Sequence, residues 1–195
     1  MTAWAITGIL AVITSLVAWF FRDPQRRPNP EELSRLKPGE QPIISPAEGK
    51  VTDITEIPGA NPADRRLRIG VFLSPIDVHV QWVPFEGKVT RITRKNGKFL
   101  PAYDPQASHL NASATIEIQN PRLGLCVVRQ ITGFLVRRIL TWTEEGSSLK
   151  PGERLGMILL GSRVEIELPK ERVNLKIRVG DKVDAGRSVI GGYEH

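Results

Sequence analysis

Hydrophobic and polar positions divide the chain into three parts. Residues 3–21 form an uncharged stretch of 19 residues with apolar side chains all round, which predicts a helix about 28 Å long, close to the hydrocarbon thickness of a bilayer. Residues 22–42 are charged and rich in proline, which predicts a stalk with at most one short turn at Glu31–Leu36. From residue 43 to residue 195, short runs of β type follow one another, the pattern of a β-rich domain.

Within the β-rich part, the clearest strand signals are short apolar or alternating runs bounded by turn residues. They lie at residues 69–73, 115–119, 123–132, 157–160 and 164–168. Residues 77–80 alternate as well, which predicts that Asp77 and His79 share one face of a strand. Residues 96–114 predict a long loop that is functional or mobile. Residues 133–142 fit either a strand or a helix.

The β-rich part contains an internal repeat. Residues 46–54 and 84–92 are identical at seven of nine positions, and residues 179–186 form a looser third copy. Each copy has the pattern of a turn that enters an alternating strand. Repeated hairpins of this kind predict a small barrel or sandwich resembling lipoyl- and biotinyl-carrier domains. We interpret the lysines of the three copies as turn or strand-edge residues rather than as carrier lysines.

Composition and charge limit the classes of partner. The chain has 41% hydrophobic and 25% charged residues, the profile of a folded protein rather than a disordered one. All charged residues lie at or after Arg22 and give a net charge of +6, which favours an anionic partner, either nucleic acid or a membrane rich in acidic lipid. The single cysteine, Cys126, excludes an intramolecular disulfide and lies in an apolar run, where we expect an inert buried thiol.

The apolar N-terminal segment favours the membrane. Residues 1–21 lack the basic start and the small-residue cleavage site of a secretory signal. Aromatic residues stand near both ends of the segment, as they do at membrane interfaces. We therefore expect a transmembrane or membrane-anchoring helix at residues 1–21. Arg22, Arg26 and Arg27 follow at once, which predicts that the domain lies on the cytoplasmic side of a cell membrane.

One dipeptide carries the main candidate chemistry. Gly161-Ser162 lies between two strand-like runs, where a Gly-Ser pair usually marks a bulge or a tight bend. The alternative is that the Ser162 hydroxyl attacks the carbonyl of Gly161, cuts its own chain and becomes a pyruvoyl cofactor. The pair by itself does not decide between the two interpretations.

Asp77 and His79 are a second candidate. Two ionisable side chains on one face could be a satisfied structural pair. They could equally be an acid–base site in which Asp77 or another carboxylate orients the imidazole of His79. The residue types alone leave both possibilities open.

Several further motifs occur in order along the chain. They are Phe20–Pro24, Ile44–Val51, Leu73–Val80, Gly97–Phe99 with Asp104–Ser108, Gln130–Gly133 with Arg137 and Arg138, Gly152–Ile158 and Gly161–Val164. Together they resemble the short form of phosphatidylserine decarboxylase. The resemblance covers nearly the whole chain, including the apolar N-terminus and the stalk.

The resemblance implies a proenzyme that cuts itself between residues 161 and 162. The fragments, 1–161 and 162–195, would stay associated, and Ser162 would become a covalent pyruvoyl group. That group would form a Schiff base with the amine of phosphatidylserine in an anionic membrane and act as the electron sink for loss of CO2, giving phosphatidylethanolamine. We expect no metal site.

The resemblance also suggests residue roles. His79 would handle the proton, because imidazole both accepts and donates near neutral pH. Three arginines are candidates for binding the phosphodiester. They are Arg137, Arg138 and Arg163. We assign no role in the reaction to His109, in the long loop, or to His195, at the C-terminus.

Two positions depart from the family pattern. Glu48 stands where the family has aspartate, and its extra methylene would move the carboxylate by about 1.5 Å. Trp82 stands where longer members have a second histidine. A catalytic triad would therefore join Ser162 and His79 to one carboxylate. That carboxylate is either Glu48 or Asp77.

Three other functions stay open. Glu48 and Trp82 would suit an unprocessed, catalytically silent family member that binds lipid or a partner at the membrane. The hairpin repeats would suit a carrier or scaffold domain. Pyruvoyl chemistry on a soluble amino acid is a third possibility, although it leaves a membrane helix without a purpose. We expect no nucleic-acid partner, and a homo-oligomer is compatible with the sequence.

Overall fold

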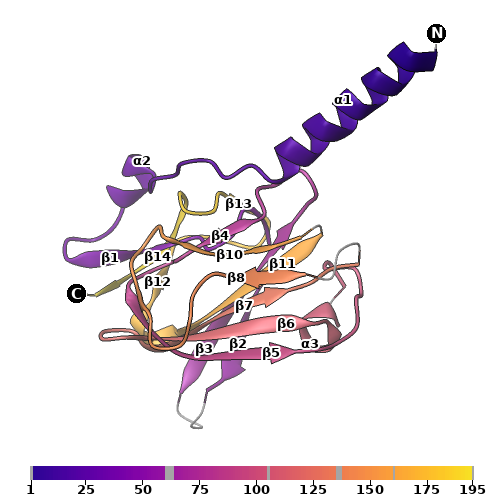
Figure 1. Ribbon diagram of the computed structural model, residues 1–195. Coiled ribbons are helices and arrows are strands. Elements are labelled where there is room, and N and C mark those ends of the chain that lie inside the picture. The colour runs from indigo at the N-terminus through magenta and orange to yellow at the C-terminus, as the bar shows by residue number, and fades with distance from the viewer. Residues whose placement is uncertain (1, 60–63, 105, 135–137, 160, 195) are drawn as a thin grey trace.

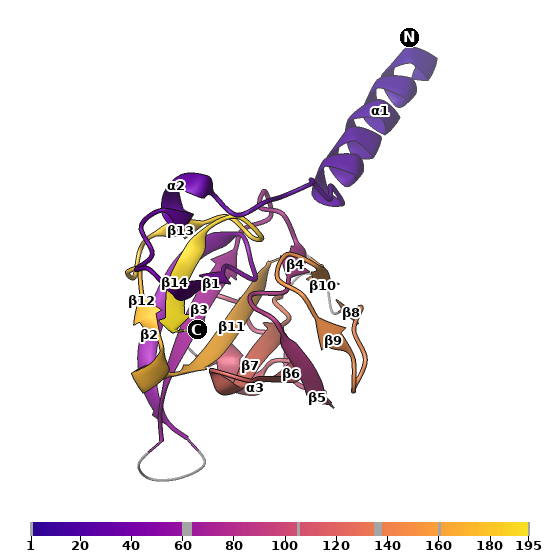
Figure 2. The ribbon, with the colours of Figure 1, turned by 90° about the vertical axis from the view of Figure 1, so that its left-hand side faces the viewer.

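The computed structural model describes residues 2–59, 64–104, 106–134, 138–159 and 161–194. Arg137, a candidate for binding the substrate, and His195, to which no role is assigned, lie outside these ranges. The described part is a β-rich body from which one helix projects, as both ribbon views show (Figure 1, Figure 2). The mainly β class predicted from the sequence is confirmed.

An eight-stranded antiparallel sheet forms most of the body. Its strand order is β13-β2-β3-β11-β7-β6-β5-β9. In that order the strands cover Lys182–Val183, Gly49–Pro58, Arg65–Leu73, Ser162–Pro169, Gly124–Ile131, Ser113–Asn120, Gly87–Lys95 and Ser148–Leu149. The sheet curls into a half-barrel (Figure 2). The small barrel or sandwich expected from the hairpins is thus present as a half-barrel.

Two three-stranded sheets complete the body. The first, in the order β1-β14-β12, consists of Glu40–Ile44, Val189–Glu194 and Asn174–Leu175. The second, in the order β4-β10-β8, consists of Val80–Trp82, Arg154–Ile158 and Ile139–Thr141. The second sheet leads into the candidate site, because β10 ends shortly before Gly161.

Apart from α1, the helices are single turns. They are α1 (Thr2–Phe20), α2 (Pro30–Leu33), α3 (Ala107–Leu110) and the 3-10 helix η1 (Lys170–Arg172). The start of α2 follows from its sequence, because the Asn29 side chain accepts a hydrogen bond of 3.1 Å from the N–H of Glu31. Proline fits the next position, where its missing N–H leaves no bond unmade. The short turn expected near this point is confirmed.

The core lies inside the curl of the large sheet. Val164 and Ile166 of β11 are buried in it. Because side chains alternate along a strand, Arg163 and Glu165 face the opposite side of the sheet. By the same alternation Ser162 shares the inner face with Val164. The sheet thus directs Ser162 inward and the charged residues of the same strand outward.

The internal repeat forms the same local structure twice. β2 and β5 each begin at the glycine of the repeat, and the register shifts at Thr52 in one and at Thr90 in the other, the mark of a β-bulge. The N–H of Val51 and that of Val89 each donate a hydrogen bond of 2.9 Å to a neighbouring turn. Each copy is an outer long strand covered by a two-residue strand, and the looser third copy supplies the cover for the first, as β13.

Two predictions about single residue types are confirmed. Cys126 is fully buried, and burial raises the pKa of its thiol to about 12, so the thiol is inert at neutral pH. The lysines of the three repeat copies, Lys50, Lys88 and Lys182, are exposed on β2, β5 and β13.

The strand predicted at residues 77–80 is wrong except at its last residue, Val80. Residues 74–77 form a turn in which the N–H of Asp77 donates to the carbonyl of Ser74 at 3.0 Å. The Asp77 carboxylate closes the same turn by accepting from the N–H of Ser74 at 2.7 Å. A proline at the second position and an aspartate that bonds its own turn favour this conformation. The strand β4 begins at Val80, so Asp77 and His79 do not share a strand face.

The proline-rich stalk packs against the body. The N–H of Asn29 donates to the carbonyl of Arg187 at 2.9 Å, and Glu32 accepts from the N–H of Val189 at 2.6 Å. The stalk predicted to end at residue 42 gives way to β1 at Glu40. Hydrogen bonds to the body, rather than proline content, therefore set the path of this segment.

Helix α1 stands clear of the body in both views (Figure 1, Figure 2). Its large apolar side chains are exposed, among them Trp4, Leu10 and Leu16. None of the helices in the described ranges combines the length and the apolar character needed to cross a membrane.

Candidate active site

The Gly161-Ser162 pair forms a bend at the entry to β11. Gly161 has a φ of +66°, in the left-handed region that glycine adopts without strain. Ser162 is the first residue of β11 and pairs with Leu73 of β3. Its side chain is fully buried, and no other described residue makes a hydrogen bond to its Oγ. Burying a hydroxyl without a partner costs about 1–3 kcal/mol, so this atom calls for a chemical explanation.

His79 also has a buried polar atom without a hydrogen-bond partner among the described residues, as do Thr55, Arg68 and Thr143. The side chain is fully buried, and its Nδ1–H donates to the backbone carbonyl of Asp77 at 2.9 Å. A carbonyl only accepts, so the proton of a neutral imidazole is on Nδ1 and the lone pair is on Nε2. Nε2 is buried without a partner in the described part of the chain. The imidazole is thus presented as a base at Nε2.

The environment keeps this imidazole neutral. Burial lowers the pKa of His79 below its ordinary value, and the positive charge of Arg22 acts in the same direction. The Asp77 carbonyl and the Asp77 charge oppose the shift without cancelling it. At neutral pH His79 can therefore accept a proton at once.

Two chain connections bring Ser162 and His79 to one end of the large sheet. Leu73, the partner of Ser162, ends β3, and the 74–77 turn leads from it to His79. On the other side, the carbonyl of His79 accepts from the N–H of Ile158 at 3.2 Å. Ile158 ends β10, which continues through a short loop to Gly161. The β3–β4 and β10–β11 connections thus meet at the site.

Phe20 covers the imidazole. The two ring centroids are 4.4 Å apart, and the ring planes make an angle of 42°. Phe20 also packs against a small apolar cluster that includes Val78, Trp82 and Met157. Sequence reasoning assigned Phe20 to the membrane anchor, and the signal that could have found it was its place in the Phe20–Pro24 motif.

Neither candidate carboxylate forms a hydrogen bond to the imidazole among the described residues. Glu48 forms an ion pair with Arg26 and accepts from the N–H of Val78 at 3.2 Å. The Asp77 carboxylate is occupied by the Ser74 turn, with a further bond of 2.6 Å from the Ser74 hydroxyl. Asp77 therefore orients His79 through its backbone carbonyl, and Glu48 holds the backbone immediately before His79. The sequence left open whether the Glu48 or the Asp77 carboxylate bonds to the imidazole of His79, and in the structure neither carboxylate does so.

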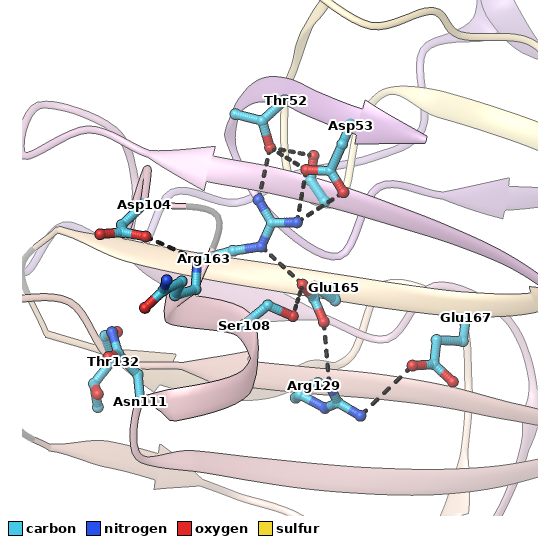
Figure 3. A network of polar contacts seen from close by, with 12 residues as sticks. Thr52, Asp53, Asp104, Ser108, Asn111, Arg129, Thr132, Arg163, Glu165 and Glu167 are labelled. Atoms are coloured by element: carbon cyan, nitrogen blue, oxygen red, sulfur yellow. Dashed lines mark hydrogen bonds and ion pairs between the residues drawn. The ribbon is translucent and has the colours of Figure 1, made fainter. Parts of the chain in front are cut away.

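Arg163 is held in a buried polar network (Figure 3). Its guanidinium donates to Glu165 at 2.8 Å, to Thr52 at 2.8 Å and to both oxygens of Asp53 at 2.9 and 2.7 Å. The side chain is 9% exposed. These bonds link β11 to β2 across the intervening strand β3, and a role of Arg163 in binding the substrate stays a prediction. Of the other two arginine candidates, Arg138 is exposed and Arg137 lies outside the described residues.

The same network fastens the long loop to the sheet. Glu165 is fully buried and accepts from the hydroxyl of Ser108 at 2.7 Å and from Arg129 at 3.3 Å. Ser108 lies on α3, so the loop predicted at residues 96–114 is ordered where the structure describes it and contains a helical turn. His109, also on α3, is exposed.

Trp82 fills the place where longer family members have a histidine. Its side chain is 1% exposed, and its ring lies 5.5 Å from the guanidinium of Arg26. Near it, a cleft of about 450 Å3 borders the 74–77 turn. Its lining includes Glu48, Asp77 and the two lysines Lys50 and Lys182. Among the described residues, no three His, Cys, Asp or Glu side chains are grouped as a metal site would require.

A left-handed glycine, a buried serine without a hydrogen bond and a neutral imidazole with a free lone pair are the parts that a self-cleaving serine proenzyme needs. Comparison with known proteins gives this class a family. The family model described as phosphatidylserine decarboxylase matches residues 13–191. The chain belongs to the phosphatidylserine decarboxylase family and is a decarboxylase by that membership.

Individual relatives agree with the family model. A phosphatidylserine decarboxylase proenzyme of Carboxydothermus hydrogenoformans is 44% identical over 189 residues, which cover 94% of this chain and 83% of the relative. A protein of the same name from Rhodopirellula baltica is 36% identical, over 98% of this chain and 77% of the relative. A third, from Symbiobacterium thermophilum, is 37% identical, over 96% and 84%. The family predicted from the sequence motifs is confirmed.

Proposed function

We propose that this protein decarboxylates phosphatidylserine to phosphatidylethanolamine and CO2 with a pyruvoyl group that it makes from Ser162. Five buried side-chain atoms lack a hydrogen-bond partner among the described residues, and the two that carry the proposal are Ser162 Oγ and His79 Nε2. One is a nucleophile in need of a base, and the other is a base with a free lone pair. The names of the relatives support processing, since each is called a proenzyme.

The first step is an acyl shift. Ser162 Oγ gives its proton to His79 Nε2 and attacks the carbonyl carbon of Gly161, so that a C–O bond forms. The C–N bond of the peptide then breaks, and the proton passes to the nitrogen of Ser162. The product is an ester in place of the peptide bond, with a free amine on Ser162. The left-handed glycine suits this step, because no side chain crowds the carbonyl.

The second step is elimination followed by hydrolysis. A base removes the proton from Cα of Ser162, the Cβ–Oγ bond breaks, and residue 161 leaves as a carboxylate. The dehydroalanine that remains takes up one water, loses one ammonia and becomes the pyruvoyl end of the fragment 162–195. The buried network around Arg163 and Glu165 would hold this new chain end on the sheet, since its bonds do not involve the broken peptide.

The residues at the site fit a pyruvoyl group. Position 162 is fully buried on the inner face of the sheet, where an electrophilic carbonyl is protected from water. Once present, the group supplies the electron sink for decarboxylation of an amine-bearing substrate. His79 Nε2 would hold the proton that the substrate carbon receives after CO2 leaves.

The test of this proposal is the intact mass of the purified protein. We expect two fragments, 1–161 and 162–195, with the smaller one lighter than a serine-started fragment by one ammonia. The Ser162→Ala variant should remain one chain and lose decarboxylation of phosphatidylserine. Ser148→Ala is the control, because Ser148 is exposed on the edge strand β9, and it should be cut as the wild type is. An uncut wild-type chain that has no activity would contradict the proposal.

One observation favours a second candidate function. Glu48 bonds to Arg26 and to the Val78 backbone rather than to the imidazole, so a three-part relay is not assembled. An unprocessed member that binds lipid without turnover would show one full-length mass and saturable binding to vesicles. The same mass measurement therefore separates the two functions.

We also propose that α1 holds the domain at a membrane. The helix exposes apolar side chains along its length, and the basic segment that follows it would lie against acidic headgroups, which are abundant in the cytoplasmic leaflet. Flotation with vesicles that contain phosphatidylserine should recover the wild type. The double variant Leu10→Glu/Ile13→Glu should stay with the soluble fraction. Equal recovery of the two would exclude α1 as the anchor.

A further inference from the structure

Gly133 lies against the carbonyl that self-cleavage must attack. A Cβ added to Gly133 would overlap the carbonyl oxygen of Gly161 and would lie 2.7 Å from its carbon. Real Cβ atoms do not approach other atoms this closely, so no side chain fits at position 133 while the carbonyl keeps its place. Gly161 itself has open space where its own Cβ would be. The crowding is therefore on the oxygen side of the carbonyl and comes from one neighbour.

The register of the sheet explains this contact. Arg163 of β11 pairs with Ile131 of β7 in an antiparallel ladder. If the same register is continued by two residues, Gly133 falls opposite Gly161. Side chains at these two positions would hold the two backbone segments apart. Glycine at both positions lets them approach closely.

The segment that carries Gly133 is held firmly from behind. Asn111 donates to the carbonyl of Thr132 at 2.8 Å and to the carbonyl of Leu100 at 2.8 Å. Its side-chain oxygen accepts from the N–H of Leu100 at 2.8 Å. Thr132 in turn donates through its N–H to the carbonyl of Ala112 at 3.0 Å. Asn111 and Thr132 lie next to each other at the left of the network in Figure 3. The hydrogen bonds at Thr132 therefore fix the backbone position of the neighbouring Gly133.

We propose that Gly133, backed by Asn111, fixes the Gly161 carbonyl for attack by Ser162. The inference rests on the proposed self-cleavage and assigns it a residue that sequence reasoning did not. A glycine with a left-handed φ can rotate its peptide plane easily, and attack by Oγ requires one face of that plane. Contact on the oxygen side prevents the rotation. As the carbonyl carbon becomes tetrahedral, its oxygen stays in place and the carbon moves toward Oγ. Gly133 thus touches the reacting group, and Asn111 is a positioning residue.

The first test is the Gly133→Ala variant in the full-length protein. The added methyl should push the carbonyl away, and a displacement of about 1 Å costs about 10²-fold in rate. We expect the cut fraction after overnight incubation to fall from complete to a small part. Gly87→Ala is the matched control. Its methyl would also be crowded, by Ile118 at 2.6 Å and by the carbonyl of Gln119 at 2.9 Å, but β5 lies two strands away from β7 in the sheet order.

Hydroxylamine at neutral pH separates the first step from the second, because it cuts the ester between residues 161 and 162. The chain also contains Asn96-Gly97, a peptide bond that alkaline hydroxylamine cuts, so the fragment masses must assign each cut to its bond. The folded Gly133→Ala chain should resist cutting between residues 161 and 162, since its block precedes ester formation. Cleavage of that variant by hydroxylamine between residues 161 and 162, or self-cleavage at the wild-type rate, would overturn the inference. If Gly133→Ala does not fold, Asn111→Asp decides, because it removes the side-chain donor to Thr132 and Leu100 and keeps the acceptor for the N–H of Leu100. That variant should fold, cut several-fold more slowly and give no ester, and wild-type cutting by it would overturn the inference.

The controls keep this inference apart from the proposed function. If the wild type and Gly87→Ala are cut while Gly133→Ala is not, both the self-cleavage and its support stand. If all three are cut equally, self-cleavage stands and the role of Gly133 falls. If the wild type itself is never cut, self-cleavage is wrong and the inference falls with it.

Discussion

The two closest copies of the internal repeat, residues 46–54 and 84–92, have the same local structure and different surroundings. Both contain Glu-Gly-Lys-Val-Thr, a bulge at the threonine and a two-residue cover strand. Glu48 of the first copy is largely buried, with a side chain 15% exposed, and is paired with Arg26. Glu86 of the second copy is exposed. The repeat therefore supplies a scaffold, and whichever segment packs on a copy determines its role.

The difference arises from the chain that precedes the first copy. The last residue of α1, Phe20, lies over His79, and the segment after the helix places Arg26 against Glu48. Arg22 adds a bond of 2.6 Å to the carbonyl of Ile76 in the turn before His79. In the described residues the second copy receives no such cover. A segment that sequence reasoning assigned to anchor and stalk thus completes the site.

The largest effect on this comparison is expected from Glu48→Ala. Without the carboxylate, Arg26 loses its partner and the N–H of Val78 its acceptor. The backbone before His79 should then shift, and a displacement of about 1 Å costs about 10²-fold in the rate of self-cleavage. Glu86→Ala should cut at the wild-type rate. The measurement is the cut fraction over time on a denaturing gel, and equal rates would show that the two copies do not differ in function.

A second effect concerns stability at the equivalent positions Asp53 and Arg91. Asp53 accepts two bonds from the nearly buried Arg163, so Asp53→Ala should lower the free energy of unfolding by about 1–3 kcal/mol. Arg91 is exposed, and Arg91→Ala should change it by no more than about 0.5 kcal/mol. Denaturant unfolding in a Ser162→Ala background keeps the chain in one piece. A loss at Arg91 as large as that at Asp53 would contradict this account.

The smallest effect is a shift in the pH dependence. The pKa of His79 is lowered by burial from its ordinary value of 6.5, so the imidazole stays neutral and self-cleavage should be level down to a pH below 6.5. The rate should fall as the pH drops through the lowered pKa, because Nε2 is then protonated. The stability that depends on a neutral His79 is likewise present above the ordinary pKa and lost through the lowered one.

Phe20→Ala should move this acid limb up toward the ordinary pKa, because water then reaches the ring. Phe21→Ala is the control, since Phe21 is 51% exposed and does not cover His79. Quench-flow or gel time courses between about pH 5 and about pH 8 would measure the acid limb of each protein, because this range spans the ordinary histidine pKa of about 6.5. Identical limbs for all three proteins would exclude Phe20 as the cover.

Sequence motifs led to the family, the mainly β class, the buried Cys126 and the bend at Gly161. These features depend on local rules, namely turn residues, alternation and the strand-breaking of glycine. The same rules failed at Asp77, because alternation at residues 77–80 also fits a turn closed by its own aspartate. At Arg163 these rules did not indicate the partners. An arginine beside a nucleophile suggests anion binding, and in the structure its side chain bonds to Glu165 of its own strand and to Thr52 and Asp53 of β2, far away in the chain.

By itself the sequence determined that Ser162 lies at a bend between strands and that His79 is a candidate base. These conclusions need only neighbours along the chain. The tertiary structure decided which atoms meet: Nδ1 of His79 with the Asp77 carbonyl, Glu48 with Arg26, and Gly133 with the carbonyl of Gly161. The reason is that strand register and burial bring together residues far apart in sequence, and the direction of a hydrogen bond or the space for one methyl group depends on that meeting.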